Sequence, residues 1–132
     1  MGIKMKDNKI SALLKWTRIL FFLNAVVWLG LGILSLSFRA LDDGSLVQWV
    51  ITVLMLINGL VMICFGIMII SGGSLVFTLA ILYMSLNVVL SITDQFGWVD
   101  ALILFLNLCL LGSLFVTRHS MNRIIEVISR ES

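Results

Sequence analysis

The chain has 132 residues, of which 61% are hydrophobic and only 12% charged, and its formal net charge is +2. Soluble domains usually contain about 45–50% apolar and about 25% charged residues, so this composition excludes an ordinary water-soluble globular protein. The apolar residues form four long blocks separated by short polar breaks, as in a membrane protein with several spans.

The chain opens with a basic segment, residues 1–18, which we expect to be a cytoplasmic flank. Its apolar side chains, such as Ile10 and Leu14, share one helical face beside lysines, as in a helix resting on an anionic membrane surface. The simpler interpretation is that the flank continues the first span as an interfacial helix, and the alternative is that it docks a partner protein at the cytoplasmic face. That span, residues 19–38, is longer than the ~7–15-residue core of a signal peptide, so we expect it to remain as a transmembrane helix.

Three further apolar blocks follow, at residues 49–70, 75–92 and 99–116. The four blocks have 18 to 22 residues each and contain no Lys, Arg or Glu. At about 1.5 Å per residue, each covers the ~30 Å hydrocarbon core as a helix. Helix is the expected state because backbone polar groups in lipid must be paired within their own segment. The tail, residues 117–132, has an apolar stripe at helical spacing and is predicted to be amphipathic and cytoplasmic.

The connections between the blocks are short, which favours antiparallel neighbours. We therefore predict an all-α fold: one domain, residues 1–132, formed by an antiparallel up-down bundle of four transmembrane helices with short amphipathic ends at the membrane surface. The tightest connection is the Ser-Gly-Gly-Ser turn at residues 71–74, where glycine supplies the positive φ that a sharp reversal requires.

Orientation follows from the basic residues. Eight of the nine Lys and Arg lie before the first span or after the last, and Arg39 is the exception. The positive-inside rule then predicts a multi-pass protein of the plasma membrane with both termini in the cytoplasm.

Each predicted span carries one asparagine: Asn24, Asn58, Asn87 and Asn107. An unpaired amide in hydrocarbon costs several kcal/mol, so these side chains should face the bundle interior or another subunit. Counting residues from the predicted span ends, the last three lie roughly 8 to 12 Å below the outer surface, whereas Asn24 lies nearer the inner one. The depths predict that Asn58, Asn87 and Asn107 can meet without Asn24.

Small and polar residues recur at helical spacing on each span and define a candidate polar seam. Its members are Asn24, Asn58, Tyr83, Asn87, Ser91 and Asn107. One interpretation is a set of helix-packing contacts in which each interhelical hydrogen bond contributes about 0.6 kcal/mol. The other is a hydrated path or pocket open to the outer side, because polar residues within membranes often serve a function. We favour the packing interpretation.

A candidate outer rim closes this seam at its outer end and consists of Arg39, Asp94 and Asp100. Arg39 is the only basic residue on the predicted outer surface, so we expect it to pair with Asp94 or Asp100. Such a contact requires the first and third helices to face one another.

The sequence offers no catalytic, metal or cofactor chemistry. Its single histidine, His119, lies beyond the last span, so haem and metal sites lack ligands within the bundle. Cys64 and Cys109 lie deep in spans without a C-x-x-C motif, and we expect them to be inert packing residues. We predict that the chain is not an enzyme and binds neither a cofactor nor a metal.

Two functions remain open. The first is a structural or accessory subunit that acts through helix–helix association. The second is a small transporter or pore, including a holin-like one, that uses the asparagine-lined seam. For either, the expected partners are the lipid bilayer and further copies of the chain or a larger membrane complex, and no nucleic acid.

Overall fold

The computed structural model describes residues 2–39, 45–71, 73–93 and 97–131, with the side chains of all of these except 2–7, 39, 93 and 131. The elements are α1 (Gly2–Arg39), α2 (Leu46–Met68), the single 3-10 turn η1 (Ile69–Ser71), α3 (Ser74–Thr93) and α4 (Trp98–Glu131). All four α-helices are long and apolar enough to cross a membrane, and the described part of the chain has no strand. The predicted all-α bundle of four helices is confirmed.

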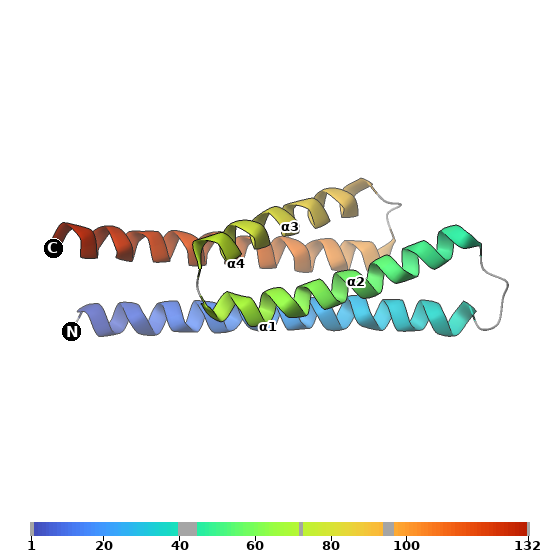
Figure 1. Ribbon diagram of the computed structural model, residues 1–132, viewed down its shortest axis with the longest axis horizontal. Helices are drawn as coiled ribbons and strands as arrows, with labels where there is room; N and C mark the ends of the chain where they lie inside the picture. The colour runs from blue at the N-terminus through green and yellow to red at the C-terminus, as the bar shows by residue number, and fades with distance from the viewer. Residues whose placement is uncertain (1, 40–44, 72, 94–96, 132) are drawn as a thin grey trace.

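The helices run up and down in chain order, so that both termini lie at one end of the molecule (Figure 1). We call this the terminal end, and the opposite end the far end. α1 packs against α2 and α4, and α3 packs against α4. α2 and α3 come together near the turn that joins them and spread apart toward the far end (Figure 1). The bundle is therefore closed near the terminal end and open between α2 and α3 at the far end.

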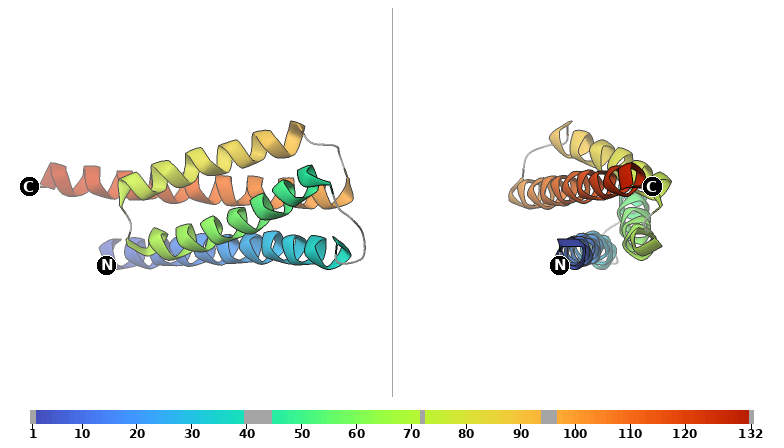
Figure 2. Two further views of the ribbon diagram at one scale, coloured as in Figure 1. Left: turned by 45° about the vertical axis from the view of Figure 1, so that its right-hand side comes forward. Right: turned by 90° about the vertical axis from the view of Figure 1, so that its left-hand side faces the viewer.

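α1 and α4 are much longer than the other two helices. They have 38 and 34 residues, against 23 for α2 and 20 for α3. Their excess at the terminal end forms an antiparallel pair that extends beyond the α2–α3 turn (Figure 1). We call this pair the stalk, residues 2–15 and 118–131. Neither helix bends where its predicted span ends, so the flank and the tail continue the helices of the first and last spans (Figures 1 and 2).

The hydrophobic core lies in the half of the bundle nearer the terminal end. α2 contributes Met62 from its second half, and α3 contributes Phe77 and Met84 from its first eleven residues, so the cluster lies toward the 71–74 turn. All four helices supply fully or almost fully buried side chains to one cluster. The members are Phe21, Ala25, Met62, Ile69, Phe77, Ala80, Met84, Leu110 and Leu114.

α1 and α2 approach each other closely at two glycines. A Cβ on Gly32 would lie 2.6 Å from Leu56 Cδ2, and one on Gly59 would lie 2.7 Å from Leu29 Cγ and 3.3 Å from the backbone oxygen of Ala25. Small residues of this kind let membrane helices approach closely. The contact holds α2 against α1 along its length, including the part where α3 has moved away.

Candidate functional site

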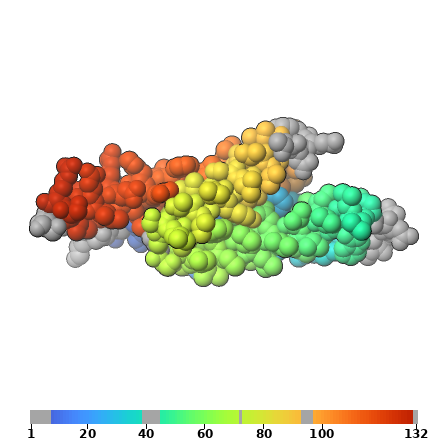
Figure 3. Space-filling view, turned by 45° about the horizontal axis from the view of Figure 1, so that its top comes forward, coloured from blue at the N-terminus to red at the C-terminus, as the bar shows by residue number. Residues whose placement is uncertain are grey.

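A groove opens between α2 and α3 in the far-end half of the described bundle. Its volume is about 670 Å³, and all four helices line it. Figure 3 shows the hollow between α2 in green and α3 in yellow, with part of α1 visible in it. We call it the α2–α3 groove. Its described lining residues are Trp28, Leu31, Ile51, Leu54, Met55, Ile57, Asn58, Val61, Tyr83, Leu86, Asn87, Leu90, Ser91, Val99, Asp100 and Ile103.

Three polar side chains on α2 and α3 form a hydrogen-bond network at the floor of the groove. Asn58 Nδ2 donates to Asn87 Oδ1 at 3.2 Å, and the Tyr83 hydroxyl donates to Asn58 Oδ1. Asn87 Nδ2 donates to the backbone oxygen of Tyr83 at 3.1 Å. The network joins α2 and α3 through these side chains, because the backbones of the two helices lie apart here.

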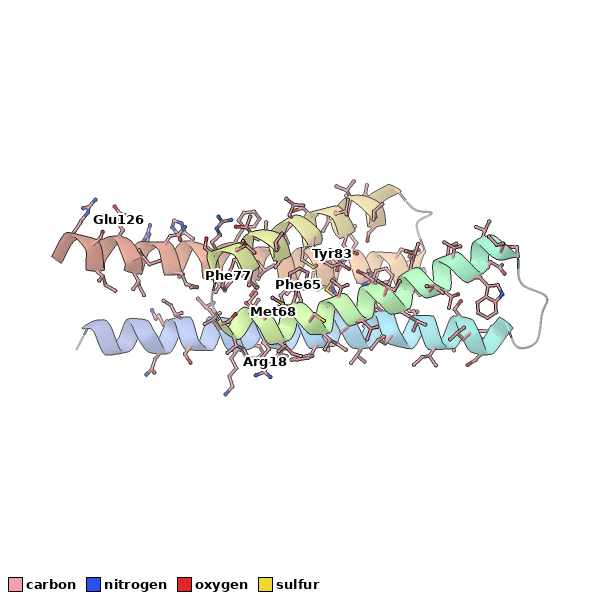
Figure 4. All side chains as sticks on the ribbon, in the orientation of Figure 1. Arg18, Phe65, Met68, Phe77, Tyr83 and Glu126 are labelled. Carbon is pink, nitrogen blue, oxygen red and sulfur yellow. The ribbon has the colours of Figure 1, made fainter. Side chains whose placement is uncertain are left out.

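Aromatic rings close the groove toward the terminal end. The Phe65 and Tyr83 rings lie between α2 and α3 with their centroids 5.4 Å apart (Figure 4). On its other side, Phe65 stacks on Phe21 of the core, with a centroid distance of 6.0 Å. The floor of the groove is therefore also the edge of the core.

The floor keeps unused hydrogen-bond donors. An amide nitrogen carries two N–H groups, and Asn58 and Asn87 each spend one of them within the network. Trp28 also lines the groove, and its indole Nε1–H is buried without a partner. Buried donors without partners are rare in proteins, so the Trp28 indole N–H distinguishes this groove, and the amides of Asn58 and Asn87 add one further N–H each beyond the bond that they donate.

Asp100 lies at the mouth of the groove, in the first turn of α4. Its Oδ2 accepts a hydrogen bond of 3.0 Å from the backbone N–H of Gly97, just before the helix begins. A carboxylate three residues into a helix stabilises the helix start in this way and also complements its dipole. Among the described lining residues, Asp100 is the only one with a charge. Ser91 of the predicted seam lies on the facing helix, α3, and is half-buried.

The remaining two amides lie in a separate contact between α1 and α4. Asn24 Nδ2 donates to Asn107 Oδ1 at 2.6 Å, and the two side chains are only 1% and 0% exposed. One bond leaves Asn24 Oδ1 and Asn107 Nδ2 buried without partners. Nearer the terminal end, Thr17 Oγ1 lies 2.6 Å from Ser113 Oγ and 3.3 Å from Thr117 Oγ1. We call this set the α1–α4 seam: Thr17, Asn24, Asn107, Ser113 and Thr117.

This pairing corrects the predicted depths. Asn107 was expected to meet Asn58 and Asn87, with Asn24 apart, yet Asn107 bonds Asn24. The depth count assumed that the spans end at one level, whereas α1 extends beyond the start of α4 at the far end (Figure 1). The four amides thus form two separate pairs, one between α1 and α4 and one between α2 and α3.

The predicted outer rim falls mostly outside the described residues. The side chains of Arg39 and Asp94 are not among them, so the proposed pairing of Arg39 stays a prediction. The third member, Asp100, accepts a hydrogen bond from the backbone N–H of Gly97.

The described residues provide no cluster of three His, Cys, Asp or Glu side chains that could hold a metal ion. Cys64 and Cys109, expected to be packing residues, are free thiols exposed on the surface of the bundle. In a membrane they would therefore contact lipid instead of the core.

Sequence reasoning missed part of the α1–α4 seam, namely Thr17, Ser113 and Thr117. A signal for it is present, because the inward-facing residues of α4 alternate at intervals of four and three, as in an antiparallel coiled coil. They are Ile103, Asn107, Leu110, Leu114, Thr117 and Met121. The matching series on α1 is Leu14, Thr17, Phe21, Asn24 and Trp28.

Comparison of the chain with family models, curated proteins and solved structures finds no match. The geometry described above is therefore the basis for a functional assignment. The four apolar, spanning-length helices support a small integral membrane protein.

Proposed function

We propose that the chain is a structural or accessory membrane subunit that associates with a partner complex through its stalk. The observation that carries this proposal is an exposed apolar stripe on the last turns of α4. Ile125 and Ile128 are 63% and 62% exposed, although they lie beyond the α2–α3 turn, in a segment that also carries Arg118 and Arg123.

The stripe continues the face with which α4 contacts α1. Met121 still packs against the core cluster, and Ile125 and Ile128 follow it at intervals of four and three. They stay exposed because α1 and α4 separate toward the termini, as the end-on view shows (Figure 2). Exposed apolar patches on charged surfaces often mark protein interaction sites. A partner helix laid between the two stalk helices would bury this stripe in the manner of a helix in a groove.

We further propose that the terminal end is cytoplasmic and that the membrane is the plasma membrane. Seven of the nine basic residues lie in the stalk, which the positive-inside rule retains in the cytoplasm. A topology reporter fused after Ser132 should then behave as an internal one, and a reporter that is active outside the cell would contradict this orientation.

The other candidate, a transporter or pore, is favoured by the groove, whose amides face an opening at the far end. A path through the molecule would have to pass Phe65 and Tyr83 and then the core. The described core in that half consists of large apolar side chains such as Phe21, Phe77 and Met84. This packing favours the accessory role.

Photo-cross-linking in native membranes tests the proposal. A photoreactive amino acid replaces Ile125 or Ile128 in the full-length chain, and the control position is Arg123, which is also exposed but lies on the opposite side of α4. We expect an adduct from the first two positions and none from the third. Adducts of equal yield from all three, or none from any, would contradict docking at the stripe. An adduct with twice the mass of the chain would identify the partner as a second copy.

A pair of charge substitutions separates docking from folding. Ile125→Glu with Ile128→Glu places two carboxylates on the exposed stripe, where they disturb no buried contact. We expect loss of the cross-linked or co-purified partner with an unchanged thermal unfolding midpoint in detergent. Retention of the partner would overturn the proposed role of the stalk.

A further inference from the structure

The α2–α3 groove is open toward the surroundings of the bundle, and its walls are apolar. Leu54 on α2 and Leu86 on α3 are 58% and 54% exposed, and the helices that carry them diverge toward the far end (Figure 3). The volume of about 670 Å³ falls within the ~300–1,000 Å³ typical of small-molecule sites. Since the side opening faces what would be the lipid phase, a ligand would enter from the hydrocarbon of the membrane.

The polar groups at the floor select the chemistry of the ligand. The Trp28 indole N–H is a buried donor without an acceptor. The amide nitrogens of Asn58 and Asn87 each donate one hydrogen bond and have a second N–H to offer. A matching ligand must therefore bring acceptor oxygens. It must also be uncharged at this depth, because the only charged lining group among the described residues, Asp100, lies at the mouth and accepts the Gly97 N–H.

Depth distinguishes two sources of such oxygens. Asn87 lies six residues before the end of α3, which is about 9 Å along the helix axis. The ester carbonyls of a bilayer lipid lie near the membrane surface, and reaching the floor would pull a charged headgroup down the apolar groove, which is costly. A lipophile with carbonyl groups on an otherwise apolar body meets the floor without that cost.

We propose that the α2–α3 groove binds an uncharged, membrane-soluble compound that carries carbonyl oxygens on an apolar body, the chemistry of isoprenoid quinones. Its carbonyl oxygens accept the free N–H groups of Trp28, Asn58 and Asn87, and its apolar tail lies between Leu54 and Leu86. The proposal concerns binding alone and includes no electron transfer. It does not depend on the association of the stalk.

Thermal unfolding of the full chain in nanodiscs of ether-linked phosphatidylcholine tests this site. The probe is a decyl-substituted benzoquinone, and the control is decylbenzene, which has the tail but no carbonyl. A ligand that binds only the folded state raises the unfolding midpoint as its concentration rises. We expect such a rise with the quinone and none with decylbenzene. An equal rise with both would overturn the proposal by showing that apolar contact suffices.

Trp28→Phe removes an unused donor without breaking any hydrogen bond in the described structure, so the variant should fold. Loss of one hydrogen bond should weaken quinone binding by about two- to tenfold. The matched control is Trp98→Phe, since Trp98 is 95% exposed and is not among the lining residues. Equal affinities for the two variants would contradict binding at this floor.

A final comparison tests whether the groove is occupied by a quinone or by a bilayer lipid. If the midpoint without ligand rises when ester-linked phosphatidylcholine replaces the ether-linked form, and the quinone then adds nothing, the occupant is a bilayer lipid and the proposed ligand class is wrong. If the quinone gives the same rise in both lipids, the proposal is supported.

Discussion

The α1–α4 seam and the α2–α3 groove both contain paired asparagine side chains, but the pair in the seam is buried and the pair in the groove lines an opening. Each has one hydrogen-bonded pair of asparagines. Asn24 and Asn107 are buried between α1 and α4, whereas Asn58 and Asn87 form the floor of an opening. An asparagine within a predicted span therefore does not by itself indicate either packing or a path. Whether such an asparagine packs between helices or lines an opening depends on the side chains around it.

Those neighbours differ in a simple way. On α4, Leu110 and Leu114 follow Asn107 at intervals that keep each buried side chain on the α1 side. Gly32 of α1 and Gly59 of α2 hold these two helices close together, while α3 packs on α4. The two hairpins are thus each internally paired at the far end, and the gap between α2 and α3 is bridged by the side chains of Asn58, Tyr83 and Asn87.

The largest difference between the two regions should appear when a leucine is truncated in each. Leu110→Ala in the core beside the seam should lower the free energy of unfolding by on the order of 2 kcal/mol, because Leu110 is 0% exposed and a cavity would remain. Leu54→Ala on the groove wall, 58% exposed, should cost less than about 0.5 kcal/mol. Unfolding in mixed micelles measures both. Equal costs would mean that the groove is packed as tightly as the core.

Double-mutant cycles should find two coupled amide pairs. Asn24→Leu with Asn107→Leu, and Asn58→Leu with Asn87→Leu, should each show a coupling of about 0.6 kcal/mol, because each pair shares a hydrogen bond. The crossed pair of Asn87 and Asn107 shares no bond and should be closer to additive. Stronger coupling in the crossed pair would restore the single cluster that residue counting predicted.

The hydroxyl contacts of the seam should contribute less to the free energy of unfolding than the amide pairs. Thr17→Val keeps the shape of the side chain but removes its contacts with Ser113 and Thr117, so we expect a loss of about 0.5 kcal/mol. The matched control is Thr78→Val on α3, where the exposed hydroxyl bonds only to the backbone oxygen of Ser74 within its own helix. Equal stability of the two variants would show that the cross-helix hydroxyls are not needed to hold the seam.

The smallest effect is expected near the mouth of the groove. Ser91→Ala should change the free energy of unfolding by no more than about 0.5 kcal/mol, because Ser91 lines open space. A loss as large as that of an amide pair would indicate that Ser91 holds α3 in place, and the comparison between an open groove and a closed seam would fail.

The fold could be read from hydropathy because four long uncharged blocks with short connections leave few arrangements. The α1–α4 seam was within reach of the sequence too, since the four-and-three alternation from Ile103 to Met121 predicts one continuous contact face. Hydropathy does not show how far one span is shifted along the bundle axis relative to another. Asn24 was misplaced because α1 extends beyond α4, and the length of each block gives no sign of that offset (Figure 1).

The groove itself could not be predicted. Periodicity placed Asn58, Tyr83, Asn87 and Ser91 on inward faces, and the structure brings the first three into one network. Whether the inward faces of α2 and α3 meet or stay apart depends on how closely each helix follows its own hairpin partner, and the contact of Gly59 with Leu29 holds α2 to α1. No single residue of the groove indicates the distance between α2 and α3.

The unequal reach of the two hairpins at the far end has a mechanical consequence for the membrane. α2 with its turn provides a spanning segment of 26 residues, about 39 Å, against 19 residues, about 29 Å, for α3. The excess at the start of α2 is apolar and exposed, with Leu46 at 79% and Val47 at 65%. Lipid beside the α1–α2 hairpin would have to thicken, or α2 to tilt, while lipid beside α3 and α4 stays near its resting thickness. Such mismatch costs a fraction of a kcal/mol per Å. The elastic energy stored in this step falls if a neighbour of similar hydrophobic height borders the taller side, so the bilayer itself would orient the protein relative to other membrane proteins.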